Sequence, residues 1–131
     1  MCAAAGIGGA AAAVREDGAR ELVDVRTVAS ETGFFGGNQD AVTVLEAIAG
    51  QPAELLRFVR RPIPVEPLLP ALLDTNPEQV SRFAVRYSSG LPVPPVVLAG
   101  QLLPDGNHRV RAAARIGRRH VDAFVLLLPA R

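Results

Sequence analysis

The chain has 131 residues, 49% of them apolar, and a formal net charge of +1. This balance indicates one globular domain with a modest core, and it excludes a global electrostatic pull toward nucleic acid or a membrane. Every basic residue is Arg, so a Schiff-base lysine and a P-loop are excluded, and the bias is typical of a GC-rich, bacterial genome. The single cysteine, Cys2, predicts no disulfide and a reducing, cytoplasmic compartment.

The N-terminal part of the chain predicts a terminus followed by an extension. Residues 1–12 are rich in Ala and Gly and predict a flexible segment, and residues 13–60 are expected to pack on the rest as an extension. The apolar pattern of residues 14–28 fits either a short strand or a short helix. The glycines at residues 32–38 predict a loop.

A helix and a proline-rich strand are expected next. Residues 41–49 predict a helix with Asp40 as its N-cap. Residues 53–59 predict a helical turn or two that leads into a strand. Four prolines between positions 62 and 70 exclude a helix there. Because proline cannot donate to a sheet ladder, the alternating Ile63 and Val65 predict an edge strand.

The clearest helix start lies at Asn76. Asn is a preferred N-cap, Pro77 suits the first helical position, and Gln79 can complete a capping box with Asn76. The apolar stripe of this helix runs to about Tyr87. A well-capped amphipathic helix is therefore expected in the middle of the chain.

The last third predicts a hairpin, a helix and a strand. Residues 96–98 and 102–103 form the expected hairpin, residues 108–116 the helix, and residues 121–128 a strand apolar enough to be central in the sheet. The order strand, helix, hairpin, helix, strand predicts an α+β fold, a small mixed β-sheet with helices packed on it, over residues 61–131. No run of the sequence reaches the length of a transmembrane helix.

The corner between the hairpin and the last helix carries the motif Asp105-Gly106-Asn107-His108-Arg109. A strand that feeds a helix through a glycine turn directs N–H groups and the positive end of the helix dipole at one spot, which favours phosphate. Arg offers phosphate a planar fork of donors, and His moves protons near neutral pH. The same residues are equally compatible with a plain strand–turn–helix corner.

Three arginines repeat along the helix that follows the corner. Arg111, Arg115 and Arg118 fall at i, i+4 and i+7, where like charges repel slightly. They predict either a solvated basic stripe or a nucleic-acid contact. No aromatic ladder interleaves them to support single-strand stacking.

Taken together, these pieces resemble the superfamily formed by ParB N-terminal domains and sulfiredoxins. The similarity covers about half of the chain, in order through residues 62–65, 74–87, 94–98, 105–109, 112–113, 117 and 121–125. Its specific part is the Asp-Gly-x-His-Arg box. The resemblance implies a ParB/sulfiredoxin-like fold and a nucleotide phosphate site at the box, which holds ATP in sulfiredoxins and CTP in ParB proteins.

The resemblance implies a role for each residue of the box. Gly106 matches the glycine that lets the backbone approach phosphate. His108 and Arg109 match the pair that contacts phosphate oxygens, with Arg109 exposed at the first helical turn. Asn107 stands where sulfiredoxins have their catalytic Cys, and an amide cannot attack a phosphorylated sulfinate, so sulfiredoxin activity is not expected. Side chains of the preceding helix fall near the nucleotide contacts of sulfiredoxins: Gln79, Arg82 and Arg86.

Two functions are therefore weighed. The first is a nucleotide-binding domain for CTP or ATP, with or without Mg²⁺, in which Asp105 and His108 would support slow hydrolysis or phosphotransfer. Asp105 is explained as well by closing the turn. The second is a non-catalytic module that binds DNA or a DNA-associated protein through the Arg-rich helix. Because little chain follows the box, the clamping of full ParB proteins on DNA is not expected.

Overall fold

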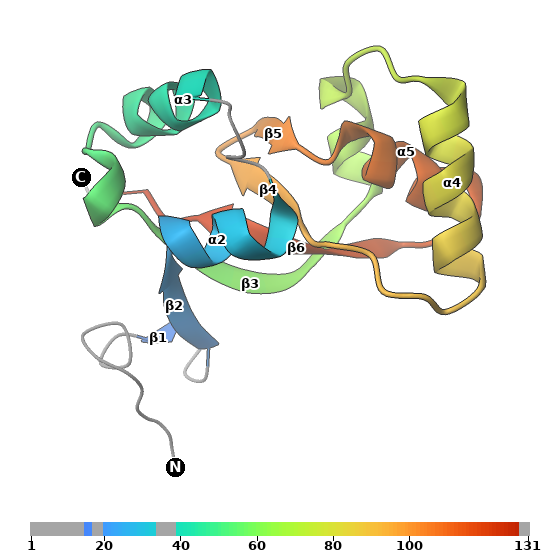
Figure 1. The fold of residues 1–131 in the computed structure, drawn as a ribbon, viewed down its shortest axis with the longest axis horizontal. Helices are drawn as coiled ribbons and strands as arrows, with labels where there is room; N and C mark the ends of the chain where they lie inside the picture. The colour runs from blue at the N-terminus through green and yellow to red at the C-terminus, as the bar shows by residue number, and fades with distance from the viewer. Residues whose placement is uncertain (1–14, 17–19, 34–38, 129–131) are drawn as a thin grey trace.

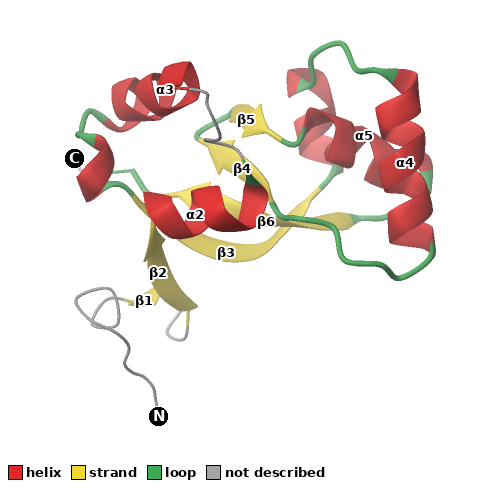
Figure 2. Cartoon of the chain, viewed as in Figure 1, coloured by secondary structure: helices red, strands yellow, loops and turns green. Residues whose placement is uncertain are grey.

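The computed structural model describes residues 15–16, 20–33 and 39–128. These residues form an α+β fold, a mixed sheet with helices packed on it (Figures 1 and 2). The strands are β1 Arg15–Glu16, β2 Arg20–Asp24, β3 Arg57–Pro64, β4 Val96–Ala99, β5 Leu102–Asp105 and β6 His120–Leu126. The helices are α2 Val25–Thr32, α3 Gln39–Ala49, α4 Pro77–Ser88 and α5 Asn107–Arg115, with 3₁₀ turns η1 Ala53–Leu55 and η2 Glu66–Ala71.

The strand order is β1-β2-β3-β6-β4-β5. β6 pairs antiparallel with β3 and parallel with β4, and β4 and β5 form the expected antiparallel hairpin. The prediction that the last strand is central is confirmed, since β6 has a neighbour on each side. Its pairing with β3 extends from Phe58↔Leu126 to Pro64↔His120, which is the longest strand pairing in the sheet.

The prediction of an edge strand at Ile63 and Val65 is wrong for β3 as a whole, because β3 lies between β2 and β6. The two halves of β3 differ, however. β2 pairs with β3 only from Asp24↔Arg57 to Leu22↔Val59. The prolines at positions 62 and 64 lie beyond the end of β2, so their missing N–H groups remove no hydrogen bond on that side. Proline therefore marks where the neighbouring strand stops.

Two hydrophobic clusters lie on opposite faces of the sheet. Successive residues of a strand point to opposite faces. Accordingly, Val97 and Phe124 pack with α2 and α3, whereas their neighbours Val96 and Ala123 pack with α5 and η2. Figure 1 shows α2 and α3 gathered near one end of the sheet and α4 and α5 near the other. The long strands β3 and β6 thus supply both cores.

The N-terminal extension is part of this sheet. The ambiguous residues 14–28 contribute strand β2 and then helix α2, which begins after Asp24. The Asp24 side chain caps α2 by accepting from the Thr27 N–H at 3.0 Å. This bond is the main cause that lowers the pKa of Asp24 below 3.8. α3 begins at Gln39, so Asp40 lies in its first turn and is not the predicted N-cap.

Several expectations fall outside what the structure describes. Residues 1–12, expected to be flexible, and most of the predicted loop at 32–38 lie outside the described residues. No helix in the described ranges is long and apolar enough to cross a membrane.

Candidate functional site

The predicted corner is present, because α5 starts immediately after β5. Gly106 is the N-cap residue of α5, with a left-handed φ of 113° and no side-chain cap. A Cβ at this position would overlap the Val96 side chain. Here glycine is therefore required by its φ and by the contact with β4. The first N–H of α5 to reach a carbonyl is that of Val110, which donates to Gly106 O at 2.9 Å.

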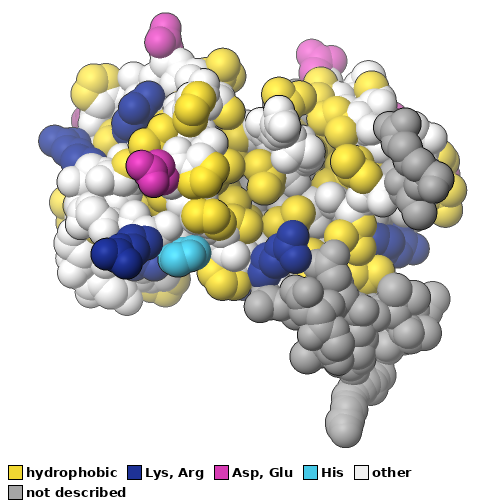
Figure 3. Space-filling view, turned by 180° about the vertical axis from the view of Figure 1, so that it is seen from behind, with side chains coloured by type: hydrophobic (Ala, Val, Ile, Leu, Met, Phe, Trp, Pro, Cys, Tyr) yellow, Lys and Arg dark blue, Asp and Glu magenta, His cyan; other side chains and the backbone are white. Residues whose placement is uncertain are grey.

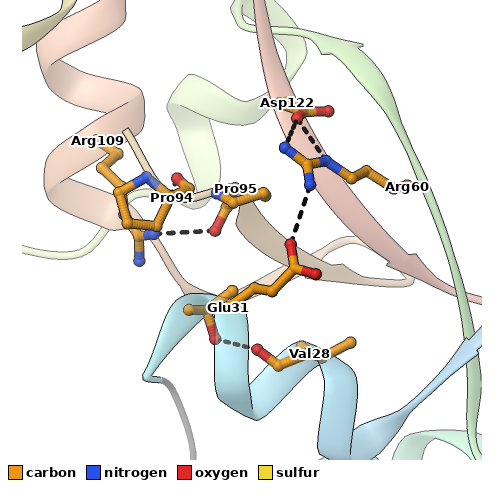
Figure 4. A network of polar contacts seen from close by, with 8 residues as sticks. Val28, Glu31, Arg60, Pro94, Pro95, Arg109 and Asp122 are labelled. Atoms are coloured by element: carbon orange, nitrogen blue, oxygen red, sulfur yellow. Dashed lines mark hydrogen bonds and ion pairs between the residues drawn. The ribbon is translucent and has the colours of Figure 1, made fainter. Parts of the chain in front are cut away.

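The side chain of Arg109 points inward, which contradicts the expectation of an exposed arginine. Arg109 is only 6% exposed. Its Nη1 donates to the carbonyls of Pro94 at 3.1 Å and Pro95 at 2.9 Å (Figure 4). Its guanidinium also lies 5.8 Å from the centre of the Phe83 ring. Arg109 thus ties α5 to the entry of β4 and to α4, and in this arrangement its donors are not presented to a ligand.

The carboxylate of Asp105 is committed to Arg109. Asp105 Oδ2 accepts from Arg109 Nη2 at 2.7 Å, and the Asp105 side chain is 24% exposed. The alternative expectation, that Asp105 closes the turn by accepting from backbone N–H groups, is not what is observed, because its carboxylate bonds the Arg109 side chain. As it stands, the carboxylate is engaged by a guanidinium and is poorly placed to act as a general base.

Asn107 and His108 hold the loop that leads into α4. Asn107 Oδ1 accepts from the Leu73 N–H at 2.8 Å, and Asn107 Nδ2 donates to the Leu103 carbonyl at 3.2 Å. His108 Nε2 accepts from the Asn76 N–H at 3.0 Å, which leaves the proton of the neutral ring on Nδ1. The box therefore joins the start of α5 to the start of α4.

The N-terminus of α4 is capped by Asn76 as predicted, but the predicted capping box is not formed. Asn76 Oδ1 accepts from the N–H groups of Glu78 at 2.8 Å and Gln79 at 3.2 Å, as an N-cap should. The predicted reciprocal bond from Gln79 is absent, because His108 takes the Asn76 N–H. Only the tertiary structure brings an imidazole to this position.

The expected nucleotide contacts on α4 are spread apart. Arg82 pairs with Glu78 at 3.5 Å on the surface. Arg86 uses Nε and Nη2 to bind the Pro92 carbonyl at 3.0 and 2.7 Å, which fixes the loop after α4. Gln79 is half-buried in the first turn. Neither arginine therefore faces the box with free donors.

The exposed arginines of α5 line a hollow beside the start of α4. Its volume is about 510 Å³, and it is lined by Thr75, Pro77, Val80, Arg111, Ala114 and Arg115. Arg115 Nη1 donates to Ser81 Oγ at 3.1 Å, whereas Arg111 is exposed and has no ion-pair partner among the described residues. Arg111 follows His108 by one turn, so the hollow opens next to the corner.

Arg118 follows the end of α5 and packs against the last turns of α4, where its guanidinium lies 4.8 Å from the centre of the Tyr87 ring. Burial raises the pKa of the Tyr87 phenol above its usual value, against a smaller lowering by Arg109 and Arg118. The three arginines of the predicted stripe therefore follow α4 in order, with two of them held on its side chains.

A surface ion-pair network joins α2 to the sheet and was not anticipated from the sequence. Arg60 of β3 donates to Asp122 Oδ2 at 2.7 Å and to Glu31 Oε1 at 3.0 Å (Figure 4). Its guanidinium lies 5.7 Å from the centre of the Phe124 ring. The three charges are far apart in the sequence. The register of β3 with β6 brings Arg60 near Asp122, and the packing of α2 on the sheet adds Glu31.

Comparisons with known proteins add no assignment: no family model, curated protein or solved structure matches this chain. Among the described residues, no group of three His, Cys, Asp or Glu side chains is placed to hold a metal ion.

Proposed function

We propose that this protein is a ParB/sulfiredoxin-like domain that binds the phosphate groups of a nucleotide, CTP or ATP, in the hollow between α5 and the start of α4. The observation that carries the proposal is Arg111, an exposed guanidinium that lines this hollow without an ion-pair partner among the described residues. An arginine with free donors favours a phosphate in its vicinity. The Asp-Gly-x-His-Arg box supports the family assignment by its position at a strand-to-helix corner.

Three further features support phosphate binding in this place. The positive end of the α5 dipole lies about one turn from Arg111. Arg115 adds a second cation, and its bond to Ser81 fixes its direction. Pro77, Val80 and Ala114 provide apolar surface of the kind that ligand sites use beside a few polar groups. In this proposal the side chain that binds the phosphate is that of Arg111 and not that of Arg109.

The proposed function is binding, and it includes no catalytic step. Asp105 is paired with Arg109, and His108 Nε2 accepts from the Asn76 N–H. Mg²⁺ prefers carboxylate oxygens, and Asp105, the carboxylate of the box, is already engaged. The residues present therefore do not fit a protein-held Mg²⁺, and any Mg²⁺ would enter with the nucleotide.

A thermal-shift panel with CTP, ATP, GTP and duplex DNA, each with and without Mg²⁺, tests the proposal. A nucleotide at 100 times its dissociation constant should stabilise the fold by about 2.7 kcal/mol. Arg111→Gln should weaken nucleotide binding by at least about tenfold, since it removes a charge-assisted contact. Arg82→Gln is the matched control, because Arg82 is an exposed arginine of α4 that does not line the hollow. Equal nucleotide affinities of the two variants would contradict the proposal.

The second candidate is a nucleic-acid contact along Arg111, Arg115 and Arg118. The observation in its favour is that these arginines follow α4 in a row and have no acidic partner among the described residues. The DNA arm of the panel distinguishes it from nucleotide binding. Binding through this row should weaken with salt, with a slope in log–log form of about −0.9 for each phosphate neutralised.

A further inference from the structure

A second hollow, of about 600 Å³, lies at the other end of α5, where the chain turns into β6. One wall comes from the end of β3 and from η2, with Pro64, Pro67 and Leu69 as apolar surface. The other wall is the turn after α5. A volume of this size is typical of small-molecule sites, whose surface is mostly apolar with a few polar groups.

Backbone hydrogen bonds fix the two walls relative to each other. Pro64 of β3 is paired in register with His120 of β6. The Val65 N–H donates to the Arg119 carbonyl at 2.9 Å. The shape of this hollow is therefore set by the central strand pair and does not depend on a mobile loop. Such a preformed site pays little ordering entropy when a ligand enters.

The charged groups at this hollow are mostly basic. Arg118, Arg119 and His120 are consecutive and exposed, and Glu66 is the one carboxylate among its lining residues. Neither arginine has an ion-pair partner among the described residues. Arg118 is held on the Tyr87 ring, so the direction of its guanidinium is restrained. In the space-filling view from behind, Arg, His and acidic side chains lie among hydrophobic ones on the surface (Figure 3).

We propose that this hollow binds a phosphate monoester whose organic part is apolar, through Arg118 and Arg119 with the organic part against Pro64, Pro67 and Leu69. Two guanidiniums suit the two negative charges and several oxygens of a monoester. The apolar wall favours a hydrocarbon ring or chain over a bare, hydrated phosphate. This site lies beyond Arg111. It shares Ala114 with the hollow of the nucleotide site proposed above, but the arginines that line the two hollows are different.

Isothermal titration of the full chain with phenyl phosphate and with inorganic phosphate tests this proposal. Phenyl phosphate should bind saturably, and inorganic phosphate should bind at least about tenfold more weakly because it lacks the apolar part. Arg119→Gln should weaken phenyl phosphate binding by at least about tenfold. This variant keeps the fold intact, because only the Arg119 backbone carbonyl bonds to Val65. Arg118→Gln should give a similar loss.

Arg26→Gln on α2 is the control, an exposed arginine of the other cluster of helices, and should change the affinity by less than about twofold. Nucleotide binding should be unchanged in Arg119→Gln, so failure of one site leaves the other test intact. Three results would overturn the proposal: no saturation by phenyl phosphate up to roughly 10 mM, equal affinity for inorganic phosphate, or an Arg119→Gln variant that binds phenyl phosphate like the parent chain.

Discussion

The two faces of the sheet are stabilised in different ways. Against α2 and α3 the core contains large side chains, with Phe58, Leu45 and Phe124 at most 1% exposed. Against α5 the helix contributes small side chains, Val110, Ala112 and Ala113, and beside them a buried arginine. Small residues let α5 lie close to the sheet but bury less apolar area.

The comparison teaches what the polar box does in this structure. On the α5 face, directional hydrogen bonds from the box tie the helix to the segment just before β4, to β5 and to the loop before α4. On the α2 face, the ion pairs of Arg60 with Glu31 and Asp122 join the helix to the strands, and they lie at the surface. The motif that predicts a ligand site in the sequence therefore has a structural role here, since it holds α5 against its neighbours. Ligand contacts are proposed for the exposed arginines next to it.

The largest effect is expected from Phe58→Ala, which tests the apolar face. Phe58 is fully buried in the cluster with Val28 and Leu45, so the truncation should lower the free energy of unfolding by about 3–5 kcal/mol. Urea unfolding measures the loss. Leu55→Ala is the control, because Leu55 is 52% exposed and its loss should be within about 0.5 kcal/mol. A loss for Phe58→Ala below that of Arg109→Ala would reverse the comparison.

The next effect is expected from Arg109→Ala, which tests the polar face. It leaves the Asp105 carboxylate and the carbonyls of Pro94 and Pro95 without their donor. Breaking such a buried pair should cost about 3 kcal/mol, at the low end for buried pairs because Asp105 is partly exposed. Thermal and urea unfolding measure this cost. Arg111→Ala, two residues later on the exposed side, should stay within about 0.5 kcal/mol.

A double-mutant cycle sharpens this result. If the cost of Arg109→Ala comes mainly from the unpaired carboxylate, Asp105→Ala in the same chain should recover part of it, since a contacting pair is not additive. If Arg109→Ala had the same free energy of unfolding as the parent chain, the box would not be what holds α5 in place.

The smallest effect concerns the helix caps, which differ between the faces because Asp24 ionises and Asn76 does not. The pKa of Asp24 is lowered in the folded state, so its stabilisation is complete above 3.8 and is lost as the pH falls through the lowered value. Asp24→Ala should therefore cost about 1 kcal/mol at pH 7 and less at about pH 2. Asn76→Ala should cost a similar amount at both pH values. An undiminished cost of Asp24→Ala in acid would contradict this assignment.

Much of the fold was predictable from local signals. The cap at Asn76, the hairpin before the corner and the apolar run of β6 each depend on neighbouring residues, and each is present. The interior position of β3 was not predicted, because its prolines are typical of an edge strand. Nothing in the sequence near these prolines shows where the partner strand β2 ends. The helix α2 was missed as a definite element, because its short apolar pattern also fits a strand.

The sequence by itself determined the strand–glycine–helix corner at Gly106, because the turn chemistry and the helix start are contiguous in the chain. Only the tertiary structure decided which side chains at this corner are accessible. Arg109 and Arg111 are two residues apart on α5, so they lie on different faces of the helix. One meets the carbonyls of Pro94 and Pro95, from a segment far away in the chain, and is buried, while the other faces the hollow beside α4. Burial is a property of packing between distant segments, and no local motif specifies it.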